Sequence, residues 1–197
     1  FKDGKHDADM LVDNIRINTN VIDMCHEFNV HRGIFCLSTY IFPEKVSIPI
    51  NENVVHDGTP NNLNYGYAYA KRYLDILCTA YNEQYGREYI PIIPCNVFGP
   101  YDNFNIKHGN VIPSLIHKAY QVKQKGEQVL KLTCTCNEIR QYVYVKDMAK
   151  LCVKVLFEYQ DTTRLLLAPN IETKISIKNI AEIVTKAFDI KLEFESE

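Results

Sequence analysis

Residues 33–42 read GIFCLSTYIF, a short and continuous apolar run that opens on Gly33 and becomes polar at its end. Such a run is typical of a parallel β-strand that is buried on both faces. Residues 88–100, EYIPIIPCNVFGP, predict a second strand that is broken by its prolines and closed by a Gly-Pro turn. Helical patterns alternate with these strands, so the sequence predicts an α/β fold with a Rossmann-like parallel sheet.

Two amphipathic helices are expected on either side of the first strand. Apolar side chains recur at helical spacing over about 8–29 and again over about 65–85, where Gly86 is expected to end the helix. On the second helix we expect Tyr69 to pack with Tyr73 and Ile76 as a core or dimer contact.

The pattern loosens after residue 100, where shorter elements follow. We expect helices over 111–122, 146–159 and 177–188, the last capped by Ser176, and short strands in VLKLT, QYVYV, RLLLAPN and KLEFE. We therefore divide the chain into residues 1–100, the C-terminal portion of a Rossmann domain, and residues 101–197, a smaller and interleaved α/β part. No glycines stand in a G-x-G-x-x-G array, so the first strands and the Gly-rich loop of such a sheet are expected to be missing.

The composition and charge of the chain argue against nucleic-acid and membrane partners. The 197 residues carry 22 basic and 24 acidic side chains, a net charge of −2, which gives no electrostatic footprint for nucleic acid. No apolar run approaches the roughly 20 residues of a membrane span, and no signal peptide is seen, so we expect no membrane partner and a cytoplasmic location.

The seven cysteines favour the same compartment, because they include no C-x-x-C pair and mostly lie in apolar runs. The closest pair is Cys134 and Cys136. Neither lies at the spacing of a zinc site, so we expect a structural role for this pair and no metal in the protein.

Three features that carry chemistry follow one another along the chain. Ser38 closes the first strand, the run YAYAK places Tyr67 and Lys71 four residues apart, and Asn96 follows the second strand. Residues four apart share one helix face, so the ammonium is expected to lower the phenol pKa from about 10 and prepare it for proton transfer. A Tyr-Lys pair alone is equally compatible with a solvated helix face. The ordered set is more specific, and it suits the reduction of a ketone or the oxidation of an alcohol with a nicotinamide.

These residues resemble the extended short-chain dehydrogenase/reductases, and within them the GDP-L-fucose synthase family. The likeness runs from about residue 11 to 197, with the GPYDNFN run at 99–105 close to a signature of this family. Its other dense stretches are CLSTYIFPEK, PNNLNYGYAYAKRYLD, VIPSLIHKAY and RQYVYVKDMA.

The resemblance implies roles for individual residues. Tyr67 would protonate the C4 oxygen of a GDP-sugar substrate while hydride arrives from NADPH, Lys71 would bind the nicotinamide ribose, and Ser38 would hydrogen-bond the same oxygen. The residues implied to border NADP(H) are Cys36, Leu37, Ser38, Thr39, Lys71, Pro94, Cys95, Asn96 and Val97. The residues implied to contact the sugar nucleotide are Asn96, Lys118 and Arg140.

The chain departs from the family at the epimerisation pair. Tyr40 stands where the family has Cys, and Asn110 stands where it has His. Asn cannot serve as the acid, and His108 lies two residues from the lost His. Residues 133–136, TCTC, replace the family's W-G-x-G run.

The resemblance therefore implies an NADP-dependent sugar-nucleotide epimerase-reductase in which epimerisation is impaired. Two alternatives remain open: another epimerase or dehydratase of the extended family, and a degenerate, non-catalytic binding or oligomerisation module. The resemblance also implies a homodimer formed through the helices at about 9–28 and 63–85.

Overall fold

The computed structural model describes residues 6–60, 62–133 and 136–195, which fall into two compact units. The first unit takes Phe1–Cys95 and Asp147–Ala168, and the second takes Asn96–Lys146 and Pro169–Glu197. The chain thus leaves the first unit after its second strand and returns to it later.

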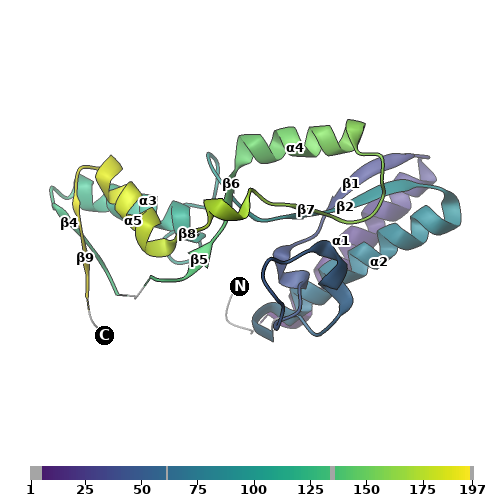
Figure 1. Ribbon diagram of the computed structural model, residues 1–197, viewed down its shortest axis with the longest axis horizontal. Helices are drawn as coiled ribbons and strands as arrows, with labels where there is room; N and C mark the ends of the chain where they lie inside the picture. Colours follow the sequence, from purple (N-terminus) through teal and green to yellow (C-terminus); the bar gives the residue numbers. More distant parts are fainter. Residues whose placement is uncertain (1–5, 61, 134–135, 196–197) are drawn as a thin grey trace. The chain divides into compact units, whose positions relative to one another are not determined.

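The first unit is built on a parallel sheet with the strand order β1-β2-β7. Its strands are β1 (Arg32–Cys36), β2 (Glu88–Pro94) and β7 (Leu165–Leu167), and its helices are α1 (Asp7–Glu27), α2 (Tyr65–Tyr85) and most of α4 (Val145–Glu158). Helices α1 and α2 lie on one side of the sheet and α4 on the other (Figure 1). The predicted Rossmann-like α/β arrangement is confirmed.

The strand predicted over residues 88–100 is divided directly after Pro94, where β2 ends before β3 (Asn96–Phe98), whereas Pro91 does not break β2. Pro91 pairs with Phe35 of β1, while β7 begins to pair only at Ile92. The carbonyl of Ile92 faces β1, because it accepts a hydrogen bond from the Leu37 N–H. Successive residues of a strand face opposite neighbours, so the nitrogen of Pro91 points away from β1, just before the ladder with β7 begins. Its missing N–H therefore costs the sheet no ladder bond.

Strand β1 is shorter than the apolar run around it suggests. It ends at Cys36, and the short 3-10 helix η1 (Thr39–Ile41) follows. The Ser38 side chain caps η1 by accepting a hydrogen bond from the Tyr40 N–H. Two further 3-10 helices, η2 (Glu52–His56) and η3 (Asn62–Asn64), lie in the loop that leads to α2.

Helix α2 ends as predicted, but it buries a different face. Gly86 follows the helix with φ at +63°, a left-handed conformation that glycine adopts without strain. Tyr69 and Ile76 are 43% and 57% exposed, so of the two expected roles the core contact is wrong and the dimer contact stays a prediction. The buried positions include two charged residues, Arg72 and Asp75, and charge is what a search for apolar periodicity overlooks.

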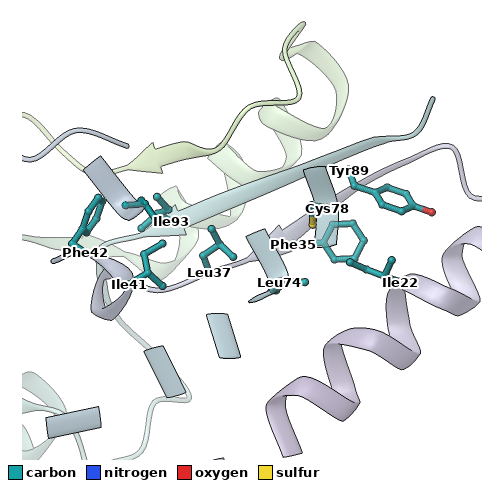
Figure 2. Close-up of a cluster of buried hydrophobic side chains, with 10 residues drawn as sticks. Ile22, Phe35, Leu37, Ile41, Phe42, Leu74, Cys78, Tyr89 and Ile93 are labelled. Carbon is teal, nitrogen blue, oxygen red and sulfur yellow. The ribbon is translucent and has the colours of Figure 1, made fainter. Parts of the chain in front are cut away.

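The core of the first unit joins both helices to the sheet. Figure 2 shows the ring of Phe35 from β1 beside Ile22 from α1 and Cys78 from α2. The ring of Tyr89 lies 5.1 Å from that of Phe35, centroid to centroid. The buried members of this cluster are Ile22, Phe35, Leu37, Ile41, Phe42, Val55, Leu74, Cys78, Tyr89 and Ile93.

Among its described residues, the second unit forms three two-stranded ladders and has its own core. Strands β3 (Asn96–Phe98) and β6 (Tyr142–Tyr144) pair in parallel, as do β4 (Val129–Leu132) and β9 (Lys191–Phe194), whereas β5 (Ile139–Arg140) and β8 (Ile175–Ser176) are antiparallel. The helices are α3 (Val111–Gln124) and α5 (Ile177–Ala187), and η4 (Ile171–Thr173) is a 3-10 turn. The predicted cap of α5 is confirmed, because the Ser176 side chain accepts a hydrogen bond from the Asn179 N–H.

The cysteines only partly follow the expectation of reduced thiols. None of Cys25, Cys36, Cys78, Cys95 and Cys152 forms a disulfide, whereas Cys136 does. Cys134 and Thr135 lie outside the described residues. Within the described ranges no cluster of His, Cys, Asp or Glu side chains could hold a metal ion. Across the same residues, no helix combines the length and apolar character needed to cross a membrane.

Candidate active site

The candidate site lies at the carboxyl end of β1, where ligands bind in parallel α/β sheets. Ser38 and Tyr40 are held there by η1, since the Ser38 hydroxyl accepts from the Tyr40 N–H at 3.3 Å and the Ser38 carbonyl accepts from the Ile41 N–H at 3.2 Å. The turn therefore fixes the backbone on both sides of Thr39.

Tyr67 and Lys71 reach this end of the strand from the first turns of α2. The Lys71 Nζ donates a 2.9 Å hydrogen bond to the carbonyl of Cys36, the last residue of β1. The same Nζ lies 5.7 Å from the centroid of the Tyr67 ring, and the Ser38 side chain is near enough to the Tyr67 phenol to lower its pKa. The structure thus brings together the three side chains to which the sequence assigned the chemistry.

The electrostatics of Tyr67 differ from the expectation. Burial raises the pKa of its phenol above the ordinary value, and the Ser38 side chain opposes that shift. Burial lowers the pKa of the Lys71 ammonium. The predicted lowering of the Tyr67 pKa is therefore wrong: desolvation of the phenolate is the largest effect, and the lowering contribution comes from Ser38 rather than from Lys71. A phenol with a raised pKa keeps its proton at neutral pH.

Two further side chains border Tyr67. The Tyr40 ring meets the Tyr67 ring edge-on with centroids 6.3 Å apart. Cys36 also acts on the Tyr67 phenol; it is exposed, and partial desolvation raises the pKa of its thiol while the Lys71 ammonium partly opposes this. Leu37 points elsewhere, since its side chain belongs to the buried core.

The residues expected beside the cofactor on the next strand lie where β2 gives way to β3. Pro94 ends β2, and the N–H of the buried Cys95 donates to the carbonyl of Leu167 in β7. Asn96 and Val97 begin β3 in the second unit, where the Asn96 side-chain amide donates to the Gln141 carbonyl. Their roles toward NADP(H) stay predictions.

The residues expected to meet the sugar nucleotide, and the altered epimerisation position, lie in the second unit. Asn110 is the N-cap residue of α3 without a side-chain cap, and Lys118 lies within α3. Arg140 is exposed on β5, and His108 is exposed in the loop before α3. Their contacts with a ligand stay predictions.

Two buried charged residues of α2 were missed by the sequence interpretation. Arg72 donates from Nε to the carbonyl of Ile41 at 2.8 Å, and the Asp75 carboxylate meets both His56 and Arg164. Charged residues on a helix are ordinarily exposed, so the run AKRYLD carries no signal that marks these two as buried.

Comparisons with known proteins agree on the family. The model of the NAD dependent epimerase/dehydratase family matches residues 2–165. The chain is 43% identical to the GDP-L-fucose synthase of Dictyostelium discoideum over 97% of this chain and 59% of that protein. It is 39% identical to the probable GDP-L-fucose synthase of Drosophila melanogaster over 96% of this chain and 61% of that protein.

Solved structures give the same result. The NADP-bound crystal structure of a GDP-L-fucose synthetase from Naegleria fowleri superposes with a TM-score of 0.90 at 35% identity, over 97% of this chain and 61% of that one. The chain thus spans about three fifths of the length of these relatives. A family match over most of the chain, a parallel α/β sheet and the Ser-Tyr-Lys cluster at its edge agree: the chain belongs to the NAD dependent epimerase/dehydratase family.

Proposed function

We propose that this chain takes part in catalysing the NADPH-dependent reduction of a GDP-4-keto-6-deoxy sugar, the type of reaction carried out by GDP-L-fucose synthases. The observation that carries the proposal is the contact of Tyr67 with Ser38 and Lys71 at the end of β1. The identity with relatives named GDP-L-fucose synthase supports the choice of substrate.

In this proposal Tyr67 is the proton donor. Its raised pKa keeps the phenol protonated at neutral pH, which suits reduction of a ketone because the oxygen of the new alcohol needs a proton. The Ser38 hydroxyl lies near the same phenol and would hold the carbonyl oxygen beside it. After the transfer, the Lys71 ammonium near the ring would stabilise the phenolate.

The residues at this edge fit the nicotinamide end of NADP(H). The bond from Lys71 to the Cys36 carbonyl keeps the ammonium beside Tyr67, and an ammonium and a hydroxyl are donors that suit ribose hydroxyls. Lys71 and the backbone of 36–39 would hold the cofactor, which supplies a hydride when bound. Pro94, Cys95, Asn96 and Val97 would also border it, as the family resemblance implies.

Epimerisation is proposed to be impaired. Removing a proton from carbon beside a carbonyl needs a base, and next to Tyr67 the chain offers the Tyr40 phenol and the Cys36 thiol, whose pKa is raised. Lys118 and Arg140 would bind the GDP moiety, since cations suit its phosphates.

A homodimer through α1 and α2 is part of the proposal. Apolar side chains that are 43–61% exposed lie along both helices, at Ile17, Val21 and Met24 of α1 and at Tyr69 and Ile76 of α2. Their spacing puts each set on one helix face, as a buried interface requires. A cytoplasmic location is also proposed, and it is supported by the thiols of five of the six described cysteines, which form no disulfide.

The dimer is tested by light scattering on a sizing column. Ile17→Asp together with Ile76→Asp should give a monomer, whereas Phe157→Asp, which changes an exposed apolar side chain on α4, should not. A monomer before any substitution would contradict the proposed interface.

The reaction is tested by incubating the protein with NADPH and GDP-4-keto-6-deoxy-D-mannose and identifying the product by NMR. We expect loss of the ketone with matching oxidation of NADPH, and little exchange of solvent deuterium at C3 and C5. A folded protein that leaves the ketone intact would instead favour the non-catalytic binding module.

A further inference from the structure

We propose that Arg72 is a positioning residue, which holds the turn carrying Ser38 and Tyr40 against Tyr67 through its bond to the Ile41 carbonyl. The kinetic part of this inference rests on the function proposed above. The structural part does not, because it concerns how one helix fixes a neighbouring turn.

The bond joins the two elements that build the site. Arg72 follows Lys71 on α2, and Ile41 is the last residue of η1, the turn capped by Ser38. The Nε of Arg72 donates to the Ile41 carbonyl at 2.8 Å, and the bond is buried. The bond thus fixes to α2 the turn that carries the Ser38 hydroxyl and the Tyr40 phenol.

Burying the charged Arg72 side chain at this position costs desolvation free energy. Its side chain is only 7% exposed, its Nη2 is buried, and this atom has no hydrogen-bond partner among the described residues. Burial lowers the pKa of the guanidinium, whose carbon lies 5.8 Å from the centroid of the Tyr69 ring. An apolar side chain would fill the space without this desolvation, so the Nε bond is the contribution that only a donor can make.

A shift of the turn that carries Ser38 and Tyr40 would change the pKa of Tyr67. The Ser38 side chain lowers the pKa of Tyr67, and the neighbouring Tyr40 raises it. Both groups belong to the segment that Arg72 holds. The pKa of Tyr67 therefore reports the position of the turn, whether or not the protein turns over a substrate.

Two variants separate the contribution of the Arg72–Ile41 hydrogen bond from that of the side-chain volume. In Arg72→Gln the amide nitrogen takes the place of Nε along the side chain and keeps a donor there, while Arg72→Met puts a methyl group in the same place. The pKa of Tyr67 is measured by NMR on protein labelled at the tyrosine ring carbon, with Tyr67→Phe to assign the signal. We expect Arg72→Met to raise this pKa by about half a unit or more as Ser38 moves away from the phenol, and Arg72→Gln to leave it unchanged.

Kinetics provide a second readout. Arg72→Met should lower kcat about 10-fold to 100-fold with little change in KM, the cost of a misplaced catalytic group, and Arg72→Gln should restore most of it. Arg72→Lys keeps the charge but puts a methylene at the Nε place, so it should behave like Arg72→Met and replaces it if that variant does not fold.

The inference is overturned if the pKa of Tyr67 in Arg72→Met equals that of the unaltered protein, or if Arg72→Lys retains the pKa and kcat that Arg72→Met loses. A protein without turnover in which Tyr67 still responds to Arg72→Met would contradict the proposed function and leave the positioning role of Arg72 supported.

Discussion

Asp75 and Arg164, 89 residues apart in sequence, form a buried ion pair that fixes α2 to the segment leading into β7. The Asp75 side chain is 1% exposed, and its carboxylate oxygens accept from Arg164 Nε at 3.0 Å, while Nη2 approaches to 2.8 Å. His56 Nε2 lies 2.8 Å from the same carboxylate. Helix α2 carries Tyr67 and Lys71, so this pair stabilises the element on which the site is built.

Removing one partner of this pair should be strongly destabilising. Arg164→Met leaves the Asp75 carboxylate buried with only His56, and we expect a loss of about 3–5 kcal/mol in the free energy of unfolding. Lys150→Met, which breaks the exposed pair with Asp147, should cost about 0–1 kcal/mol.

Denaturant unfolding checks both values. Adding Asp75→Leu to Arg164→Met should recover part of the loss, because no charge then stays buried without its partner. Equal losses in Arg164→Met and Lys150→Met would show that the buried pair contributes no more than a surface one.

Gly66 should not tolerate even a methyl group. A Cβ at this position would lie 2.2 Å from the backbone oxygen of Asp7, the first residue of α1. Alanine is the better helix former by about 1 kcal/mol, so propensity alone predicts that Gly66→Ala stabilises the protein. We expect a net loss of about 1–3 kcal/mol instead, measured by thermal unfolding, because backbone must move. A higher melting temperature in Gly66→Ala would mean that α1 and α2 are not in such close contact.

Tyr81 should make stability fall at high pH. Its phenol donates to the Asp23 carboxylate, and this bond, together with partial burial, raises the pKa of Tyr81 to about 12. The folded chain then holds the phenol proton more tightly than the unfolded chain. The stabilisation is fully present below about pH 10, the pKa of an ordinary tyrosine, and is lost as the pH rises toward about 12.

Urea unfolding of the unaltered protein and of Tyr81→Phe, at pH 8 and at pH 11, measures this contribution. The advantage of the unaltered protein should shrink at pH 11, and Asp23→Asn should remove the pH dependence of that advantage. An advantage that stays constant over this range would exclude the hydrogen bond as its source.

The sequence predicts those parts of this fold that depend on local patterns. Helix α2 begins and ends where apolar spacing and Gly86 place it, and Ser176 caps α5, because these signals act over a few residues. Strand β2 differs because the fit of Pro91 depends on which neighbour its nitrogen faces, and that is a property of the assembled sheet.

The candidate site shows the same division. The order of Ser38, Tyr67 and Lys71 along the chain was enough to predict that these residues lie close together. They do so because the carboxyl end of β1 lies beside the first turns of α2. The direction of the Tyr67 pKa could not be predicted, because it depends on how much solvent the fold removes from the phenol. The burial of Arg72 depends on the same three-dimensional packing.

The central claim is that Tyr67 donates the proton in a ketone reduction, and its most direct test is the rate of NADPH oxidation by Tyr67→Phe with a GDP-4-keto-6-deoxy sugar. This substitution removes one phenolic oxygen and no ring, so the melting temperature should stay close to that of the unaltered protein while the rate falls by about 100-fold or more. Tyr65→Phe, a matched change at an exposed tyrosine of the same helix, should keep the full rate. Full turnover in Tyr67→Phe would contradict the account and make this tyrosine a structural residue.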